Sequence, residues 1–349
     1  MVKGYIGSYT KSEGKGIYRF ELNEQSGRIE TVETGYELNA STYLAQYQDT
    51  LLAVTKEGDK AGLASFKIDK EGQLEKTGAS LTSLKGSGCY VAISPDGQYA
   101  FEAVYGDGVA RIYALDAENQ RITRLIEEVM HDYPHGPNVA RQEKSHVHYL
   151  DVTPEQKYVV AVDLGADLLV TYHYGDQGLE VAHRTALEPG DGPRHLVYHK
   201  TGRYAYVVNE LSNTVVVMTY DDGRFIEQER HLTIPEDFLH PTKLAAVRIS
   251  HDQRFLYVSN RGHDSIAIFK LLDDGARLEL VDIVASGGAF PRDFNITNDD
   301  AYLVVAHETG ASEVVVFRRD EASGQLTLID HQQSAPEGVC VKFLDVSHL

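Results

Sequence analysis

Apolar and polar positions along the chain follow one pattern that recurs about seven times, most legibly over residues 193–223. Each copy consists of an apolar strand, a polar turn, a second apolar strand that ends in a short charged peptide, and two further strands. Within strands such as residues 204–208, β-branched and aromatic residues dominate, and turn-forming pairs such as Asp222-Gly223 separate the strands. Long helical periodicity is absent, so the pattern predicts an all-β chain.

The copies can be aligned on the end of the second strand. The aligned residues are Ser8, Thr55, Val104, Asp163, Asn209, Asn260 and Ala306. Successive copies are 47, 49, 59, 46, 51 and 46 residues apart. Four-stranded propeller blades of about 40 to 50 residues, joined by loops of varied length, produce spacings of this kind. A β-solenoid and a string of separate sandwiches remain alternatives at this point.

The two ends of the chain favour the propeller. Residues 3–10 match a second strand, and residues 338–344 match a first strand. Together they complete one blade, and a ring closed in this way has no exposed sheet edges. The sequence therefore predicts a single all-β domain of residues 1–349, a seven-bladed β-propeller with four-stranded blades, in which the N- and C-terminal strands share one blade.

Charge and composition narrow the range of partners. The formal net charge of 33 − 52 = −19 disfavours nucleic acid and anionic membranes as partners, because they carry the same sign. No apolar run approaches the roughly 18 residues that a membrane helix needs, and residues 1–10 lack the apolar core of a signal peptide, so we expect a cytoplasmic protein. Cys89 and Cys340 fall in non-neighbouring blades and are expected to be small buried apolar residues rather than a disulfide.

Propeller topology also predicts where polar chemistry gathers. The first two strands of a blade are antiparallel, so the start of the first and the end of the second lie at the same edge, and we expect these positions from all blades at one mouth of the central channel. They include His146, His148, Arg194, Lys243, Arg292, Lys56, Tyr105, Asp163, Glu210, Arg261, His307 and Glu308. The other edge receives polar turns. Such an asymmetry is expected of a functional site on a scaffold.

The longest spacing, 59 residues, marks an insertion. The extra residues fall in 131–148, called the insertion loop below, which carries His131, His135, Arg141 and Gln142. A loop of this length in a compact domain is usually functional or disordered. Its place before the first strand of the fourth blade predicts a lid over the charged mouth.

Several roles are open for the two rim histidines and the rim arginines. His146 and His148 are two residues apart on a strand and share a face, a spacing that zinc sites use, but no third ligand is apparent, so we expect no metal. His148 is a candidate for catalysis or substrate binding, and a structural role is the alternative. Arg194 and Arg292 each follow a proline in the same position of the repeat, which favours anion recognition over pairing with carboxylates such as Asp293.

Glu210 and Arg261 end two other second strands. A carboxylate among histidines and arginines is a candidate general acid or base, and an ion pair with Arg194 or Arg261 is the alternative. Arg261 is a candidate substrate ligand, or a member of the turn formed by residues 261–265.

These residues carry a resemblance to a known family. The chain resembles the lactonase family of seven-bladed propellers typified by the cycloisomerase-type 6-phosphogluconolactonase, with carboxymuconate-lactonising enzyme as a relative. The matching segments cover nearly the whole chain and include YIGSYTKSEGKGIY, ISPDGQYAFEAVYGDG, GPNVARQEKSHVH, GDGPRHLVYHKTGRYAYVVNELSNTV, SHDQRFLYVSNRGHDSIAIF and FPRDFNIT. Val104 replaces the asparagine usual before the tyrosine-glycine pair of the third blade.

The resemblance implies a carboxylic-ester hydrolase that converts 6-phospho-glucono-δ-lactone to 6-phosphogluconate in the pentose phosphate pathway, without metal or cofactor. It implies catalytic roles for His148, Glu210 and Arg194, and substrate binding by Arg261, Arg292, His146, Arg141 and Gln142. Either Glu210 or His148 would accept the proton of the attacking water. The expected partner is a small anionic sugar lactone, and the expected state is a monomer or weak homo-oligomer. A lactonising cycloisomerase acting on a muconate-like dicarboxylate and a non-catalytic binding module are the alternatives.

Overall fold

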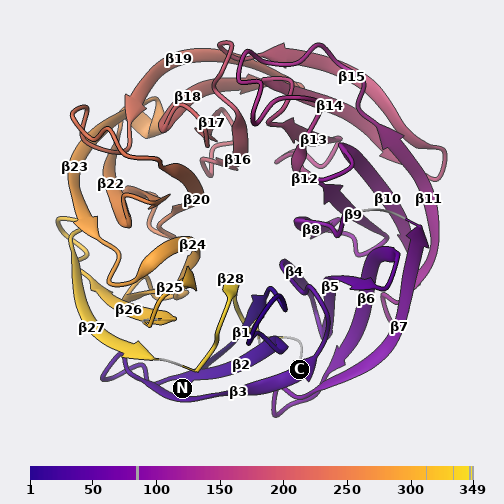
Figure 1. The fold of residues 1–349 in the computed structure, drawn as a ribbon, viewed down its shortest axis with the longest axis horizontal. Coiled ribbons are helices and arrows are strands. Elements are labelled where there is room, and N and C mark those ends of the chain that lie inside the picture. The colour runs from indigo at the N-terminus through magenta and orange to yellow at the C-terminus, as the bar shows by residue number, and fades with distance from the viewer. Residues whose placement is uncertain (84–85, 312, 333, 346, 348–349) are drawn as a thin grey trace. The chain divides into compact units, whose positions relative to one another are not determined.

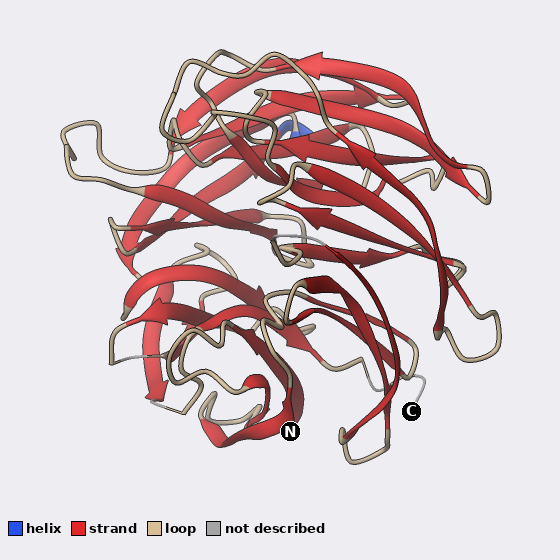
Figure 2. Cartoon of the chain, turned by 45° about the vertical axis from the view of Figure 1, so that its right-hand side comes forward, coloured by secondary structure: helices blue, strands red, loops and turns tan. Residues whose placement is uncertain are grey.

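The computed structural model describes residues 1–83, 86–311, 313–332, 334–345 and 347. In this part of the chain, strands β1 to β28 form seven antiparallel four-stranded sheets. A short 3-10 helix, η1 (Asp273–Gly275), is drawn in blue in Figure 2. The rest of the described chain consists of strands and loops. The all-β prediction is confirmed. Cys340 is buried and Cys89 is half-buried.

The chain divides into two compact units, which are described separately. Unit 1 contains Met1–Thr34, His195–Asp221 and Phe225–Phe343, and unit 2 centres on Gly35–Arg194. The prediction of a single domain over residues 1–349 stays a prediction.

Unit 1 carries four of the described sheets, some of whose strands cross its boundaries. Their strands, in sheet order, are β28 (Gly338–Phe343), β1 (Val2–Ser8), β2 (Gly16–Leu22) and β3 (Ile29–Glu37); β16 (Pro193–Tyr198), β17 (Tyr204–Asn209), β18 (Thr214–Asp221) and β19 (Arg224–Leu232); β20 (Lys243–Ile249), β21 (Phe255–Arg261), β22 (Ser265–Leu272) and β23 (Arg277–Ala285); and β24 (Ala289–Ile296), β25 (Tyr302–Thr309), β26 (Val314–Arg319) and β27 (Leu326–Gln332).

Unit 2 carries the other three described sheets. Their strands, in sequence order, are β4 (Leu44–Tyr47), β5 (Thr50–Glu57), β6 (Lys60–Ile68) and β7 (Leu74–Ser83); β8 (Tyr90–Ile93), β9 (Tyr99–Val104), β10 (Val109–Leu115) and β11 (Ile122–Met130); and β12 (Val147–Val152), β13 (Tyr158–Asp163), β14 (Leu168–Gly175) and β15 (Gly178–Ala186).

The last and first strands of the chain share one sheet. β28 pairs with β1 in antiparallel register, with Gly4 opposite Phe343 and Ile6 opposite Val341. Figure 1 shows β28, in yellow, beside β1, in indigo. The predicted completion of one blade by both ends of the chain is confirmed.

Neighbouring sheets of unit 1 bury their apolar faces against each other. Phe255 and Tyr257 of β21 pack with Phe294 of β24 and Val305 of β25, and all four are at most 1% exposed. Successive side chains of a strand point to opposite faces of its sheet, and every residue of β21 is buried, so both faces of this strand are covered. The core is thus built between blades, which leaves the strand ends available for polar chemistry.

The pairing register supports the predicted position of the rim residues within a sheet. Lys243, at the start of β20, lies opposite Arg261, at the end of β21. Pro291 likewise lies opposite His307, and in unit 2 Val147 lies opposite Asp163. Starts of first strands and ends of second strands therefore share an edge in these sheets.

Candidate functional site

The insertion loop is bonded to the sheet that follows it. The amide of Gly136 donates to the carbonyl of Gly165 at 2.9 Å. The side-chain amide of Gln142 donates to the carbonyl of Leu164 at 2.9 Å and to Asp167 Oδ1 at 2.7 Å. Gln142 is only 1% exposed. Gln142, a predicted substrate ligand, is therefore a buried residue of the loop whose side-chain amide joins the loop to residues 164–167.

Four side chains of unit 2 gather around the ring of Tyr105. We call them, with Tyr105, the histidine cluster: Tyr105, Arg141, Glu143, His146 and His148. The Tyr105 ring stacks on the His146 ring, with centroids 4.2 Å apart and planes at 14°. The His148 ring meets the same tyrosine edge-on at 5.5 Å and 72°. Arg141 Nη2 donates to the Tyr105 hydroxyl at 3.3 Å.

His146 makes two hydrogen bonds through its ring. Nδ1 lies 2.9 Å from the carbonyl oxygen of Tyr105, and Nε2 lies 3.1 Å from Glu143 Oε1. Both partners are acceptors, so the two bonds form together only when both ring nitrogens carry a proton. Burial acts to raise the pKa of Glu143, but its backbone hydrogen bond and the bond from His146 outweigh burial and lower this pKa. Glu143 and Tyr105 thus fix the orientation of His146.

Asp163, a predicted rim carboxylate, forms hydrogen bonds with the insertion loop. Its Oδ1 accepts the backbone N–H of His146 at 2.8 Å, and its Oδ2 lies 2.8 Å from His131 Nδ1. His131 Nε2 in turn lies 2.8 Å from the Tyr172 hydroxyl. Burial acts to raise the pKa of Asp163, yet the bonds from His131 and the backbone lower it overall. The aligned second-strand position therefore carries a structural bond in this blade.

Unit 1 presents a cluster of opposite charges. We call it the arginine cluster: Glu210, Arg261, Arg292 and Glu308. Arg261 Nη2 donates to Glu210 Oε2 at 2.7 Å, and both side chains are at most 5% exposed. Arg261 also donates from Nε to the carbonyl of Lys243 at 3.3 Å. The ion pair with Arg261, one of the alternatives left open for Glu210, is present.

The side chain of Arg292 does not pair with its sequence neighbour. Its Nη1 lies 3.3 Å from Glu308 Oε2, and its guanidinium carbon lies 5.2 Å from the centre of the Tyr9 ring. Asp293, given above as an example of a carboxylate partner, accepts from Arg248 Nη2 at 2.7 Å. Arg292 therefore pairs with a carboxylate, the alternative left open above, and that carboxylate is Glu308.

The charges of the arginine cluster act on one another. Burial is the main cause that lowers the pKa of Arg261, and the positive charge of Arg292 acts in the same direction. Glu210 and Glu308 oppose this change. Two guanidinium groups and two carboxylates therefore form a charge-balanced group in a poorly solvated place.

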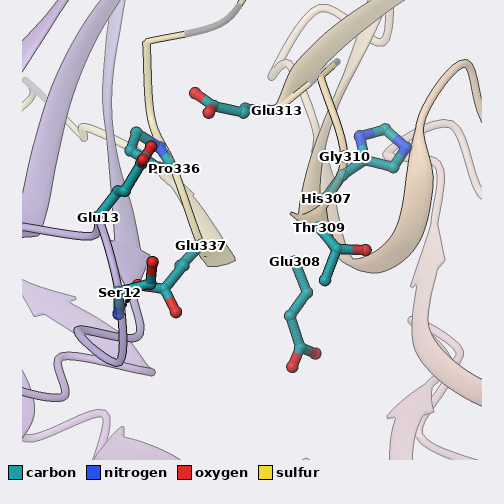
Figure 3. Close-up of a pocket in the computed structure, with 9 residues that line it drawn as sticks. All are labelled: Ser12, Glu13, His307, Glu308, Thr309, Gly310, Glu313, Pro336 and Glu337. Atoms are coloured by element: carbon teal, nitrogen blue, oxygen red, sulfur yellow. Dashed lines mark hydrogen bonds between the residues drawn. The ribbon is translucent and has the colours of Figure 1, made fainter.

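A cavity of about 140 Å³ adjoins Glu308 in unit 1. Figure 3 shows Ser12, Glu13 and Glu337 on one side and Glu308 and Thr309 on the other. The cavity is also lined by His307, Gly310, Glu313 and Pro336. Burial raises the pKa of Glu313, and the negative charge of Glu13 adds to this effect. None of these nine lining residues is a lysine or an arginine.

The structure separates the predicted site residues into groups with different neighbours. It brings Arg141, His146 and His148 together in unit 2, and it brings Glu210 and Arg261 together in unit 1. Arg194 lies in β16 and is 2% exposed. Its catalytic role stays a prediction.

Two residues of the histidine cluster had no assigned role in the sequence. Tyr105 was recognised only as a rim position, and Glu143 was not singled out. The spacing of Glu143 and His146, three residues apart, was the available signal, but the contact depends on the loop conformation. Glu308 was likewise only a rim position.

The described residues hold neither a candidate metal centre nor a candidate membrane helix. Among them, no group of three or more histidine, cysteine, aspartate or glutamate side chains is arranged to hold a metal ion. They also contain no helix with the length and apolar character required to cross a membrane.

Comparison with known proteins settles the family. Residues 3–343 match the family described as Lactonase, 7-bladed beta-propeller. The chain belongs to this lactonase family. The seven sheets are therefore the seven blades of a β-propeller with four strands each, as the repeat predicted.

Similar proteins agree with this assignment. An uncharacterized protein of Staphylococcus saprophyticus is 60% identical over 98% of this chain and 99% of its own. A periplasmic gluconolactonase of Pseudomonas aeruginosa superposes with a TM-score of 0.90 at 26% identity, over 99% of both chains. A Bacteroides fragilis protein, provisionally described as a 6-phosphogluconolactonase, superposes with a TM-score of 0.89 at 28% identity over 99% of this chain and 98% of its own.

Proposed function

We propose that this lactonase-family propeller hydrolyses the cyclic ester of a sugar acid of the glucono-δ-lactone type. The 6-phosphorylated lactone, which would yield 6-phosphogluconate for the pentose phosphate pathway, is the substrate that the family resemblance predicts. The names of the two similar structures support the class, since one is a gluconolactonase and the other is described as acting on the phosphorylated form.

His148 is our choice for the general base. The Glu210 carboxylate is engaged by Arg261 at 2.7 Å, whereas imidazole is the side chain that most often moves protons near neutral pH. In the proposed reaction His148 accepts a proton from water while the water oxygen bonds to the lactone carbonyl carbon. The ring carbon–oxygen bond then breaks, and the ring oxygen takes the proton back from His148.

Arg261 is our choice for stabilising the negative charge of the tetrahedral intermediate. Its guanidinium is held by Glu210 and by backbone carbonyls, so the donor needs little rearrangement when charge develops on the substrate. Glu210 would then act by orienting Arg261. Arg141 and His146 remain the proposed substrate ligands of the histidine cluster.

The observation that carries the proposal is the oriented His148–Tyr105–His146 arrangement in a chain of the lactonase family. The test is a lactonase assay with glucono-δ-lactone, its 6-phosphorylated form and muconolactone, each corrected for spontaneous hydrolysis. We expect acceleration of at least one gluconolactone that is lost in H148Q. Acceleration of muconolactone alone would favour the cycloisomerase alternative. No acceleration of any lactone would favour a binding module.

A further inference from the structure

The charge of Arg292 is already balanced in the structure. Its guanidinium lies 3.3 Å from Glu308 and faces the ring of Tyr9 at 5.2 Å. A phosphate clamp requires a cation whose donors can turn to the ligand, usually in bidentate fashion. Here, a phosphate would have to compete with the Glu308 carboxylate for the same guanidinium.

The surroundings of this pair add negative charge. Arg261 is paired with Glu210, so the four members of the arginine cluster sum to zero. The adjoining cavity is lined by three further carboxylates, those of Glu13, Glu313 and Glu337. Two of them bind backbone amides: Glu337 accepts from Gly14 at 2.9 Å, and Glu313 accepts from Ala335 at 2.8 Å. These hydrogen bonds hold the carboxylates at the cavity wall.

The same arrangement suits a neutral polyol. A sugar hydroxyl both donates and accepts hydrogen bonds, so it can donate to Glu308 while it accepts from Arg292. A phosphate monoester offers mainly acceptors and carries about −1.5 to −2 charges near pH 7. Like charges brought close together are costly, and screening is weaker in a partly enclosed cavity than in bulk water.

We propose that Glu308 is a specificity-determining residue that makes the arginine cluster bind the neutral hydroxyls of a sugar lactone and disfavour a phosphorylated one. The inference rests on the proposed lactonase activity and narrows it to the lactone without a phosphate. It also replaces the phosphate-binding role for Arg292 with the binding of hydroxyl groups.

The test compares the kcat/KM values of glucono-δ-lactone and 6-phospho-glucono-δ-lactone in the wild type, in E308Q and in E13Q. Glu13 lines the same cavity but is not the carboxylate paired with Arg292, so E13Q makes the same charge change as a matched control. We expect the wild type to prefer the unphosphorylated lactone. In E308Q, kcat/KM for the phosphorylated lactone should rise about tenfold, as expected for one removed like-charge contact, and E13Q should change it less than threefold.

A binding measurement separates this inference from the proposed function. Calorimetry with gluconate and 6-phosphogluconate on the same three proteins needs no turnover. Tighter binding of gluconate by the wild type, reversed or equalised in E308Q, supports the inference even if neither lactone is hydrolysed. A wild type that prefers the phosphorylated lactone or acid, equal behaviour of E308Q and E13Q, or no binding of either acid would overturn it.

Discussion

The histidine cluster and the arginine cluster stabilise their polar groups in different ways. In the histidine cluster, rings stack around Tyr105 and hydrogen bonds run to a carbonyl and to the half-exposed Glu143. In the arginine cluster, opposite charges balance one another, and the Arg261–Glu210 pair is almost completely buried. The first arrangement holds imidazole rings in fixed orientations, so it suits proton transfer. The second suits the fixed positioning of charge.

The largest expected effect concerns the base of the histidine cluster. In H148Q we expect kcat for the preferred gluconolactone to fall about 10²- to 10⁴-fold, with KM changed little, because general-base help of this size is lost. Steady-state kinetics above the spontaneous background measures it. His173, exposed on β14, provides the matched control, and H173Q should keep wild-type kinetics.

The opposite result would exchange the roles of the two clusters. If H148Q keeps its kcat while E210Q loses it, then Glu210 is the base and its pairing with Arg261 is broken during turnover. The variant E210Q is informative here because the amide keeps the shape of the carboxylate while removing its basicity.

The second prediction concerns stability. In E210A we expect the free energy of unfolding to fall by about 3–5 kcal/mol, because Arg261 is left as a buried, uncompensated cation. The double variant E210A/R261M should lose clearly less, since both charges are then absent. Urea denaturation followed by circular dichroism measures both. A solvent-exposed ion pair provides the comparison: R277A, which breaks the Arg277–Asp273 pair, should lose only about 0–1 kcal/mol. Equal losses in E210A and R277A would contradict the contrast between buried and exposed ion pairs.

The fold could be predicted from local signals in the sequence. Which strand ends lie at the same edge of a sheet could be predicted from topology. Apolar strands with glycine-containing turns specify blades, and antiparallel pairing then places Lys243 opposite Arg261 whatever their side chains are. The contacts between blades did not follow. Arg261 meets Glu210 51 residues away, and no local rule selects that partner.

The sequence also could not show which rim side chains bond the backbone and which face a channel. Asp163 occupies the position at which Asn260 is found in another blade, and both side chains bond the chain that enters their blade. A carboxylate at this position looks the same in sequence whether its side chain faces a channel or accepts a hydrogen bond from a backbone amide. Glycine is easier to interpret: Gly262 has a φ of 88°, and a Cβ there would lie 2.4 Å from the carbonyl oxygen of Pro241.

The third prediction uses the histidine next to Glu308. Burial lowers the pKa of His307 to about 4, against an opposing effect of Asp264. Its Nε2 lies 3.1 Å from Ser286 Oγ, and its buried Nδ1 has no hydrogen-bond partner among the described residues, so the neutral ring is favoured. The ordinary histidine pKa near 6.5 applies after unfolding. The unfolded chain therefore binds the extra proton first as the pH falls.

The sign of the pH dependence follows from this difference. The contribution of His307 to stability is fully present above about pH 6.5 and is lost as the pH falls toward 4, by on the order of 3 kcal/mol. We expect the urea midpoint of the wild type to fall more steeply between pH 7 and 4 than that of H307N, which cannot titrate there. Parallel curves for the two proteins would show that His307 is not a buried neutral group.

The smallest expected effect tests how Tyr105 organises the histidine cluster. Y105F removes the hydroxyl that accepts from Arg141 but keeps the ring, so KM should rise roughly 2- to 10-fold, equivalent to about 0.5–1.5 kcal/mol, with kcat nearly unchanged. Y105L also removes the stacking on His146 and the edge contact with His148, so kcat should fall as well. Y99F, at the other end of β9, loses only an exposed bond to Asp176 and should behave as wild type. Identical kinetics for Y105F and Y105L would show that the Tyr105 ring does not position His148. Ring stacking would then no longer distinguish the histidine cluster from the arginine cluster, and only their charges would.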